Sequence, residues 1–197
     1  MTAIRRVLVV ATLFVLGLAA APAAGAGQVG EQLQSRLDRV VGILEDRSLK
    51  AHPEARRTAL RGAATEIFDF TEITRRSLGR HWQAATPAER EELVQLFTAL
   101  LERAYVGRVE QFNGERVAVT GEARDGELAT VRTRLVGKSG AETAVDYRLH
   151  RAGDRWMAYD VSVEGVSLVA NYRAQFNRII QASSAQGLVQ RLRARRE

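Results

Sequence analysis

Three polar residues on one face of a predicted strand are the best candidates for acid–base chemistry. Asp146, Arg148 and His150 alternate with apolar residues within residues 143–150, so they point to the opposite face of the strand from those neighbours. A carboxylate and an imidazole that lined a cleft could exchange protons with a substrate. The same alternation is typical of a strand with one face in the core and a polar face toward solvent. The sequence favours this second interpretation, because the other face is already apolar.

Other kinds of reactive site are not indicated. His52, His81 and His150 are far apart in the sequence and there is no cysteine, so neither a zinc-ligand spacing nor a disulfide is possible. Residues 165–169 read Gly-Val-Ser-Leu-Val and lack the second glycine of a nucleophile elbow. A glycine-rich phosphate loop is also missing from the sequence. We therefore predict no catalytic residue, no metal site and no cofactor.

Residues 1–26 have the pattern of a cleaved secretory signal. Arg5 and Arg6 precede an apolar run over residues 7–21, and small residues follow at 24–26, which is the order of such a signal. The run is short for a membrane span, and no stop-transfer charges follow it. We expect a signal peptide over 1–26 and a single exported domain over 27–197, with a retained N-terminal anchor as the alternative.

The charge of the chain excludes some partners. The formal net charge is +6, but the basic residues are too dispersed to indicate a nucleic-acid surface. A mild positive excess could favour anionic lipid headgroups or acidic partners. The arginine-rich C-terminal segment fits the end of a helix, where cations are favourable, and docking to a membrane or a partner is the alternative role. No second apolar run is long enough to cross a bilayer, so we expect no stable membrane insertion.

Helical periodicity dominates the first half of the chain. Apolar residues recur at helical spacing over residues 28–49, 53–68, 69–79 and 87–112. Asp69 with Glu72 three residues later is a typical helix start, and Gly79 is a typical stop. Thr86, followed by a proline and then Glu89, is a stronger start signal. The helix that begins there is the longest, and we expect it to lie across the sheet.

The pattern changes to strands after residue 113. Strands with alternating apolar residues are separated by turn signals at residues 124–126, 137–140 and 151–154. Short turns predict an antiparallel meander of about four strands with one covered face. The last strand, 156–163, leads into a helix over 166–182, with Gly165 at the corner and Ser167 as the N-cap. We predict an α+β fold with several helices packed on one face of the sheet.

Several short segments carry a family resemblance. They lie at residues 78–82, 85–90, 97–105, 147–148, 156–161, 164–169, 171–173 and 175–176. Through these segments the chain resembles the MlaC family of periplasmic phospholipid-binding proteins, also called the toluene-tolerance auxiliary family. The resemblance covers roughly residues 33–192 and is most specific in its last third.

The resemblance implies a soluble periplasmic carrier. Such a protein would hold the acyl chains of a glycerophospholipid in an apolar cavity between sheet and helices, with the headgroup at or near solvent. Its partners would be an outer-membrane lipoprotein complex and an inner-membrane ABC transporter with an MCE-domain subunit. A diacyl lipid is too apolar to cross water alone, so we expect a cavity at or above the usual upper size of ligand sites.

Apolar and aromatic residues at inward-facing positions are the candidate lipid contacts. They are Phe97, Leu100, Tyr105, Val131, Tyr147, Leu149, Met157, Tyr159, Val161, Val166, Val169, Tyr172 and Phe176. Asn171 and Arg173 are candidates for contact with a headgroup or a partner, or for bonds across the helix–sheet corner. From periodicity alone, the apolar set is more simply explained as a packed core. Two other functions stay open: an α+β enzyme that uses Asp146 and His150, and a periplasmic chaperone or adaptor that binds protein.

Overall fold

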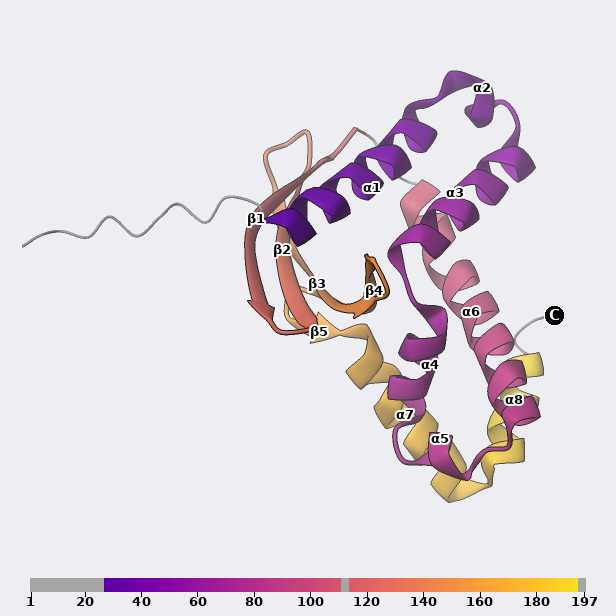
Figure 1. Ribbon diagram of the computed structural model, residues 1–197. Helices are drawn as coiled ribbons and strands as arrows, with labels where there is room; N and C mark the ends of the chain where they lie inside the picture. Colours follow the sequence, from indigo (N-terminus) through magenta and orange to yellow (C-terminus); the bar gives the residue numbers. More distant parts are fainter. Residues whose placement is uncertain (1–26, 111–113, 195–197) are drawn as a thin grey trace, which may run out of the picture.

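The computed structural model describes residues 27–110 and 114–194, and the backbone alone for 106–110 (Figure 1). Its elements in chain order are α1 Gln28–Glu45, α2 Arg47–Lys50, α3 Pro53–Ile67, α4 Phe70–Leu78, α5 His81–Ala84, α6 Pro87–Glu110, β1 Arg116–Asp125, β2 Leu128–Val136, β3 Glu142–Ala152, β4 Arg155–Val163, β5 Val166–Ser167, α7 Leu168–Ala182 and α8 Ala185–Ala194. The predicted signal segment 1–26 and the expected end of the long helix at Phe112 lie outside the described residues. The predicted α+β fold is confirmed.

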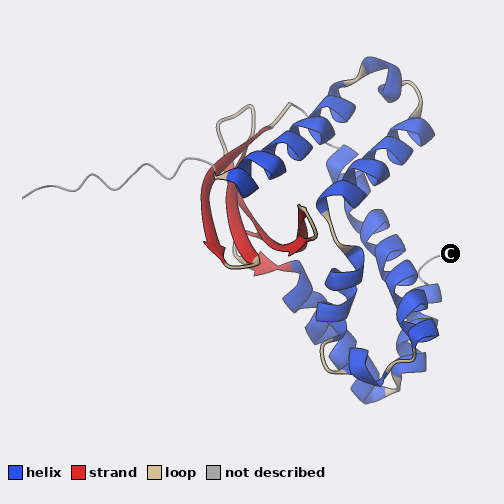
Figure 2. Ribbon diagram, in the orientation of Figure 1, coloured by secondary structure: helices blue, strands red, loops and turns tan. Residues whose placement is uncertain are grey.

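The strands form one antiparallel sheet in the order β1-β2-β3-β4-β5. The predicted meander is confirmed, and the short β5 adds a strand that the sequence did not reveal. The register shifts between Val119 and Gly121 and again between Arg148 and Leu149. Such bulges bend a strand and increase its twist, and Figure 2 shows a strongly curved sheet.

Helix α1, rather than the long α6, covers the sheet. Val29, Leu33 and Leu37 on α1 are buried in one cluster with residues of β2, β3 and β4. The side chain of Gln34 also pairs with the outer edge of β1, since its Nε2 donates to the Val117 carbonyl and its Oε1 accepts from the Val119 amide, both at 3.0 Å. A helix thus protects an edge strand that would otherwise be open to pairing.

Helix α6 belongs to a second, all-helical core. Its buried face packs with α4, α7 and α8, and Phe97 at its centre is fully buried. The expectation that this helix lies across the sheet is therefore wrong. Its apolar face is broad, and a broad apolar face packs equally well on helices or on a sheet.

The predicted helix boundaries are confirmed where local capping signals were present. The Asp69 carboxylate accepts a hydrogen bond from the Glu72 amide at 2.9 Å, and Gly79 adopts a φ of 55° at the end of α4. At the start of α6, the Glu89 carboxylate accepts from the Thr86 amide at 2.8 Å, while the Thr86 hydroxyl accepts from the Glu89 amide at 3.3 Å. This is a complete capping box.

The two cores meet at the connection between α3 and α4. Phe68 is half-buried and packs against both apolar clusters. Its backbone forms a parallel bridge with Ala158 of β4, and the Asp69 amide donates to the Ala158 carbonyl at 2.9 Å. We call this region, with its aromatic neighbours Phe70 and Tyr147, the junction.

In the described part of the chain, every helix is too short or too polar to cross a bilayer.

Candidate functional site

The predicted lipid contacts divide between the two cores. Phe97, Leu100, Val169 and Phe176 are buried in the helical core, and Tyr172 packs against it. In the sheet core, Val131, Tyr147 and Leu149 are buried, and Val161 packs against them. The sequence thus identified apolar positions in both cores, but it could not show that they form two separate clusters.

Aromatic rings line the junction. The ring of Phe68 lies 6.4 Å from that of Tyr147 at an interplanar angle of 29°, and 6.1 Å from that of Phe70. Burial raises the pKa of Tyr147 to about 12, because the phenolate would lose its hydration. Sequence reasoning missed Phe68 and Phe70, which sit at a helix boundary where apolar periodicity breaks down.

The helical side of the site is an aromatic cluster. The rings of Tyr172 and Phe176 approach Phe97 edge-on, with centroid distances of 4.8 and 4.9 Å. Edge-to-face contacts of this kind stabilise by about 0.5–1.5 kcal/mol beyond area burial. Two of these rings come from α7 and one from α6, so the cluster holds these helices together beside the junction.

Four further candidates have different surroundings. Met157 is buried, whereas the ring of Tyr159 lies 3.8 Å below the Arg76 guanidinium in a cation–π contact. Tyr105 is 37% exposed and Val166 is 67% exposed. The inward orientation expected for Tyr105 and Val166 is therefore wrong. Val166 belongs to β5, where it pairs with Val163, and not to the helical stripe that its spacing suggested.

A buried carboxylate fixes the corner between β4 and α7. Asp160 is 2% exposed, and its two oxygens accept hydrogen bonds from the Ser167 hydroxyl at 2.6 Å and from the Val169 amide at 3.0 Å. Ser167 caps α7 as predicted, accepting from the Ala170 amide at 3.0 Å. Gly165 has the positive φ, 79°, that the change of direction requires. Sequence reasoning missed Asp160 because it alternated like an exposed strand residue.

The residues predicted to meet a headgroup or a partner lie on α7. Arg173 donates through Nε to the Arg76 carbonyl at 2.7 Å and so ties α7 to α4. Asn171 is exposed. A headgroup or partner contact for these two residues stays a prediction.

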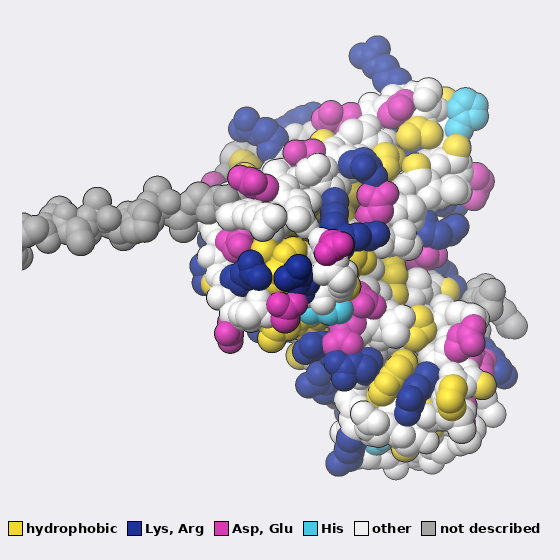
Figure 3. Space-filling model, viewed as in Figure 1, with side chains coloured by type: hydrophobic (Ala, Val, Ile, Leu, Met, Phe, Trp, Pro, Cys, Tyr) yellow, Lys and Arg dark blue, Asp and Glu magenta, His cyan; other side chains and the backbone are white. Residues whose placement is uncertain are grey.

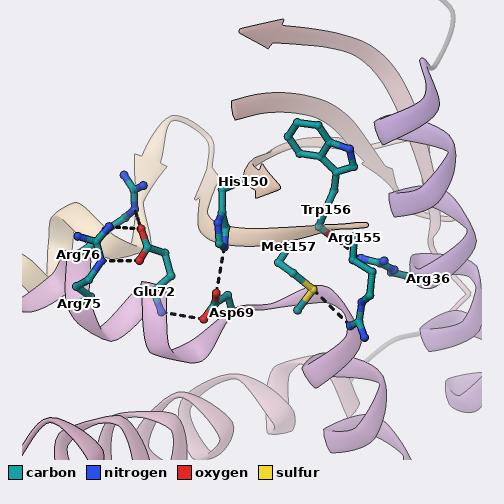
Figure 4. Close-up of polar contacts among 9 residues, drawn as sticks. All are labelled: Arg36, Asp69, Glu72, Arg75, Arg76, His150, Arg155, Trp156 and Met157. Carbon is teal, nitrogen blue, oxygen red and sulfur yellow. Dashed lines mark hydrogen bonds and ion pairs between the residues drawn. The ribbon is translucent and has the colours of Figure 1, made fainter. Parts of the chain in front are cut away.

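His150 does not form the acid–base pair that the enzyme hypothesis required. Its Nε2 lies 3.0 Å from the Asp69 carboxylate, at the N-cap of α4 (Figure 4). The Asp69 side chain is therefore shared between a helix cap and an imidazole, an arrangement that fastens β3 to the junction.

Glu72, one turn further along α4, is held by Arg75 and Arg76 (Figure 4). The hydrogen bond from Arg75 is the main reason that the pKa of Glu72 is lowered. Asp69 and Glu72 have the spacing of a capping box, but the Glu72 carboxylate is bound by these arginines and the Asp69 amide by the Ala158 carbonyl. Over the described residues, His, Asp and Glu side chains nowhere gather in a group of three or more that could bind a metal.

The described surface has two notable hollows. One of about 350 Å³ lies between α7 and α8, with Arg178 and Arg191 on its walls. The other, about 560 Å³, lies between α1 and β1 and includes Glu31 and Asp38. None of the predicted lipid contacts lines either hollow. The large apolar cavity implied by the resemblance stays a prediction.

Lys and Arg are spread over the visible face, as the dispersed charge in the sequence indicated (Figure 3).

Fold and site together define an α+β protein in which a helix-covered meander and a helical core share one aromatic junction. The family model described as MlaC protein matches residues 34–194. The chain belongs to the MlaC family, and the recognition made from short segments is confirmed.

Two similar proteins give this assignment detail. The toluene tolerance protein ttg2D of Pseudomonas putida is 26% identical over 129 residues, which are 64% of this chain and 60% of that protein. A solved structure of a phospholipid-binding protein from Ralstonia solanacearum, in complex with a phospholipid, is 27% identical. It superposes with a TM-score of 0.78 over 86% of this chain and 97% of that one.

Proposed function

We propose that this chain is a periplasmic phospholipid carrier that takes the acyl chains at the junction between its two cores. The observation that carries the proposal is the convergence of apolar side chains from both cores on Phe68, in a fold similar to that of a protein solved with a phospholipid. We further propose that it moves lipid between an outer-membrane lipoprotein complex and an inner-membrane ABC transporter with an MCE-domain subunit.

The physical task of such a carrier is binding rather than covalent chemistry. Each methylene removed from water contributes roughly 0.8 kcal/mol, so two long acyl chains cannot cross an aqueous space exposed. The competing environment for the lipid is a bilayer, which buries the chains equally well. The free energies of loading and release are therefore nearly balanced. A partner that stabilises either the lipid-bound or the lipid-free protein can decide whether lipid is taken up or released.

Entry of a lipid requires the two cores to separate. Eight of the predicted contacts, among them Phe97, Val131 and Leu149, are at most 9% exposed, so other protein atoms already surround them. Acyl chains placed between the cores would replace one set of apolar contacts with another, at little cost in hydrophobic free energy. The Asp160 corner would keep β4 and α7 connected while this happens.

Native mass spectrometry of residues 27–197, purified without detergent, tests the proposal directly. The expected result is a bound mass equal to one diacyl phospholipid, identified after extraction. A protein that carries no lipid and takes none from vesicles contradicts the proposal and points to the chaperone or adaptor alternative.

The position of the site is tested by Val161→Glu, which places a charge among the sheet-core residues. A matched control is Val163→Glu, the same change two residues along β4, where the side chain is 48% exposed. We expect Val161→Glu to lose bound lipid and Val163→Glu to retain it. A folded Val161→Glu protein that still carries lipid would show that this wall of the site is assigned wrongly.

A further inference from the structure

Two arginines from different elements contact neighbouring residues at the start of β4. Arg36 of α1 donates through Nη1 to the Trp156 carbonyl at 2.6 Å. Arg155 lies next to that tryptophan, and its Nη2 is 3.4 Å from the sulfur of Met157 (Figure 4). Neither contact neutralises a charge, because a carbonyl and a thioether are uncharged acceptors.

The charge of this pair has little compensation. Within the described residues, no carboxylate is paired with either guanidinium. Glu66 acts on Arg36 through its charge, but both oxygens of Glu66 are already held by Arg39. Burial, followed by the charge of Arg155, lowers the pKa of Arg36. Two cations held together without an anion cost free energy, which an anion between them would recover.

The pair lies next to the junction. Trp156 and Met157 are both buried, and Trp156 is part of the sheet core. Ala158, the residue that bridges to Phe68, is two positions beyond Trp156 on the same strand. At about 3.3 Å per strand residue, the Trp156 carbonyl is about 7 Å from the bridge. This separation suits a molecule with an anionic group joined by a short linker to apolar chains.

We propose that Arg36 and Arg155 bind the phosphate of the phospholipid, an inference that rests on the proposed function. Guanidinium groups bind phosphate oxygens with paired, charge-assisted hydrogen bonds. A phosphate ester is common to all glycerophospholipids, so this site selects for the presence of a phosphate and not for the alcohol esterified to it. The acyl chains would then extend from the pair toward Phe68.

The test compares two lipids with the same acyl chains, of which only one carries a phosphate headgroup. Binding of phosphatidylglycerol and of diacylglycerol with the same acyl chains is measured for the wild-type protein, Arg155→Gln and Arg36→Gln. Each substitution is expected to weaken binding of phosphatidylglycerol about tenfold, the effect of losing one charge-assisted interaction, and to leave diacylglycerol binding unchanged. Arg61→Gln is the matched control, since it removes the same charge from α3, where Glu102 already neutralises it.

The outcomes separate the two proposals. Equal loss of both lipids in a folded Arg155→Gln protein, or no loss of either, overturns the phosphate site while leaving the carrier function intact. A wild-type protein that binds neither lipid overturns both. Arg155 is exposed, so its variant keeps the test valid even where Arg36→Gln unfolds through loss of the Trp156 contact.

Inorganic phosphate distinguishes a lipid site from a site for the free anion. The lipid assignment predicts that millimolar phosphate does not compete with phosphatidylglycerol, because the acyl chains provide most of the affinity. Displacement of the lipid by phosphate alone, abolished in Arg155→Gln, would overturn the assignment in favour of a free-anion site.

Discussion

Replacing Asp160 with alanine should destabilise the protein more than any other single change at the β4–α7 corner. Its carboxylate is buried and accepts two hydrogen bonds, from the Ser167 hydroxyl and the Val169 amide. The Arg148 guanidinium lies 3.6 Å away, but its side chain is 54% exposed. The two accepted hydrogen bonds therefore dominate, and the ion pair adds about 1 kcal/mol or less.

The magnitude follows from the groups left behind. A hydrogen bond to a charged group is worth about 1.5–3 kcal/mol, and Asp160→Ala leaves a buried amide without an acceptor. The expected loss in the free energy of unfolding is about 3–5 kcal/mol. Ser167→Ala removes one of the two donors and the helix cap, and should cost about 1 kcal/mol. Asp160→Asn keeps one acceptor oxygen and should fall between these values.

Urea unfolding followed by circular dichroism measures these differences. Asp146→Ala is the matched control, because it removes a half-buried carboxylate on the neighbouring strand, opposite Ser162. We expect the control to cost about 1 kcal/mol or less, the usual effect of a single substitution. If Asp160→Ala is no more destabilising than Asp146→Ala, the carboxylate does not hold the corner and the reasoning is refuted.

Two further substitutions test the sheet core and the corner. The pKa of Tyr147 is about 12 in the folded protein and about 10 in the unfolded chain, so the folded state binds this proton more tightly. The stabilisation should be complete below pH 10, and the free energy of unfolding should fall by roughly 2–3 kcal/mol between pH 10 and 12. Urea unfolding measured at several pH values should show this loss for the wild-type protein and not for Tyr147→Phe. Gly165→Ala should lower the free energy of unfolding by about 1 kcal/mol, because φ is 79° at this position, although no atom lies within 4 Å of the added Cβ. Gly62→Ala is the control: its surroundings are equally open but its backbone is helical, so it should be stabilising. Thermal unfolding measures both effects.

Local signals in the sequence predicted the elements well. The capping box at Thr86 and Glu89, the stop at Gly79 and the corner at Gly165 and Ser167 each depend on residues within a few positions of one another. These helix starts, stops and corners can therefore be predicted from the sequence alone. The meander follows for the same reason, since short turns between alternating strands leave few other topologies.

Long-range pairings could not be predicted. Asp69 and His150 are 81 residues apart, and neither residue type indicates the other. Asp160 occupies a strand position that reads as solvent-facing until α7 is known to fold back against it. Val166 has helical spacing relative to Val169, yet its pairing with Val163 of β4 holds it in a strand. In each case a tertiary contact outweighs the local pattern.

The division into two cores explains why the candidate site was hard to place and why it suits a carrier. A pattern of inward apolar residues is the same for one core, for two cores and for a cavity. Under the proposed function, the acyl chains would enter where the two cores meet at Phe68. The strong polar contacts lie beside that surface, at Asp160 and between Asp69 and His150. In that proposal, a lipid would displace weak, non-directional contacts, and the directional ones would preserve the fold.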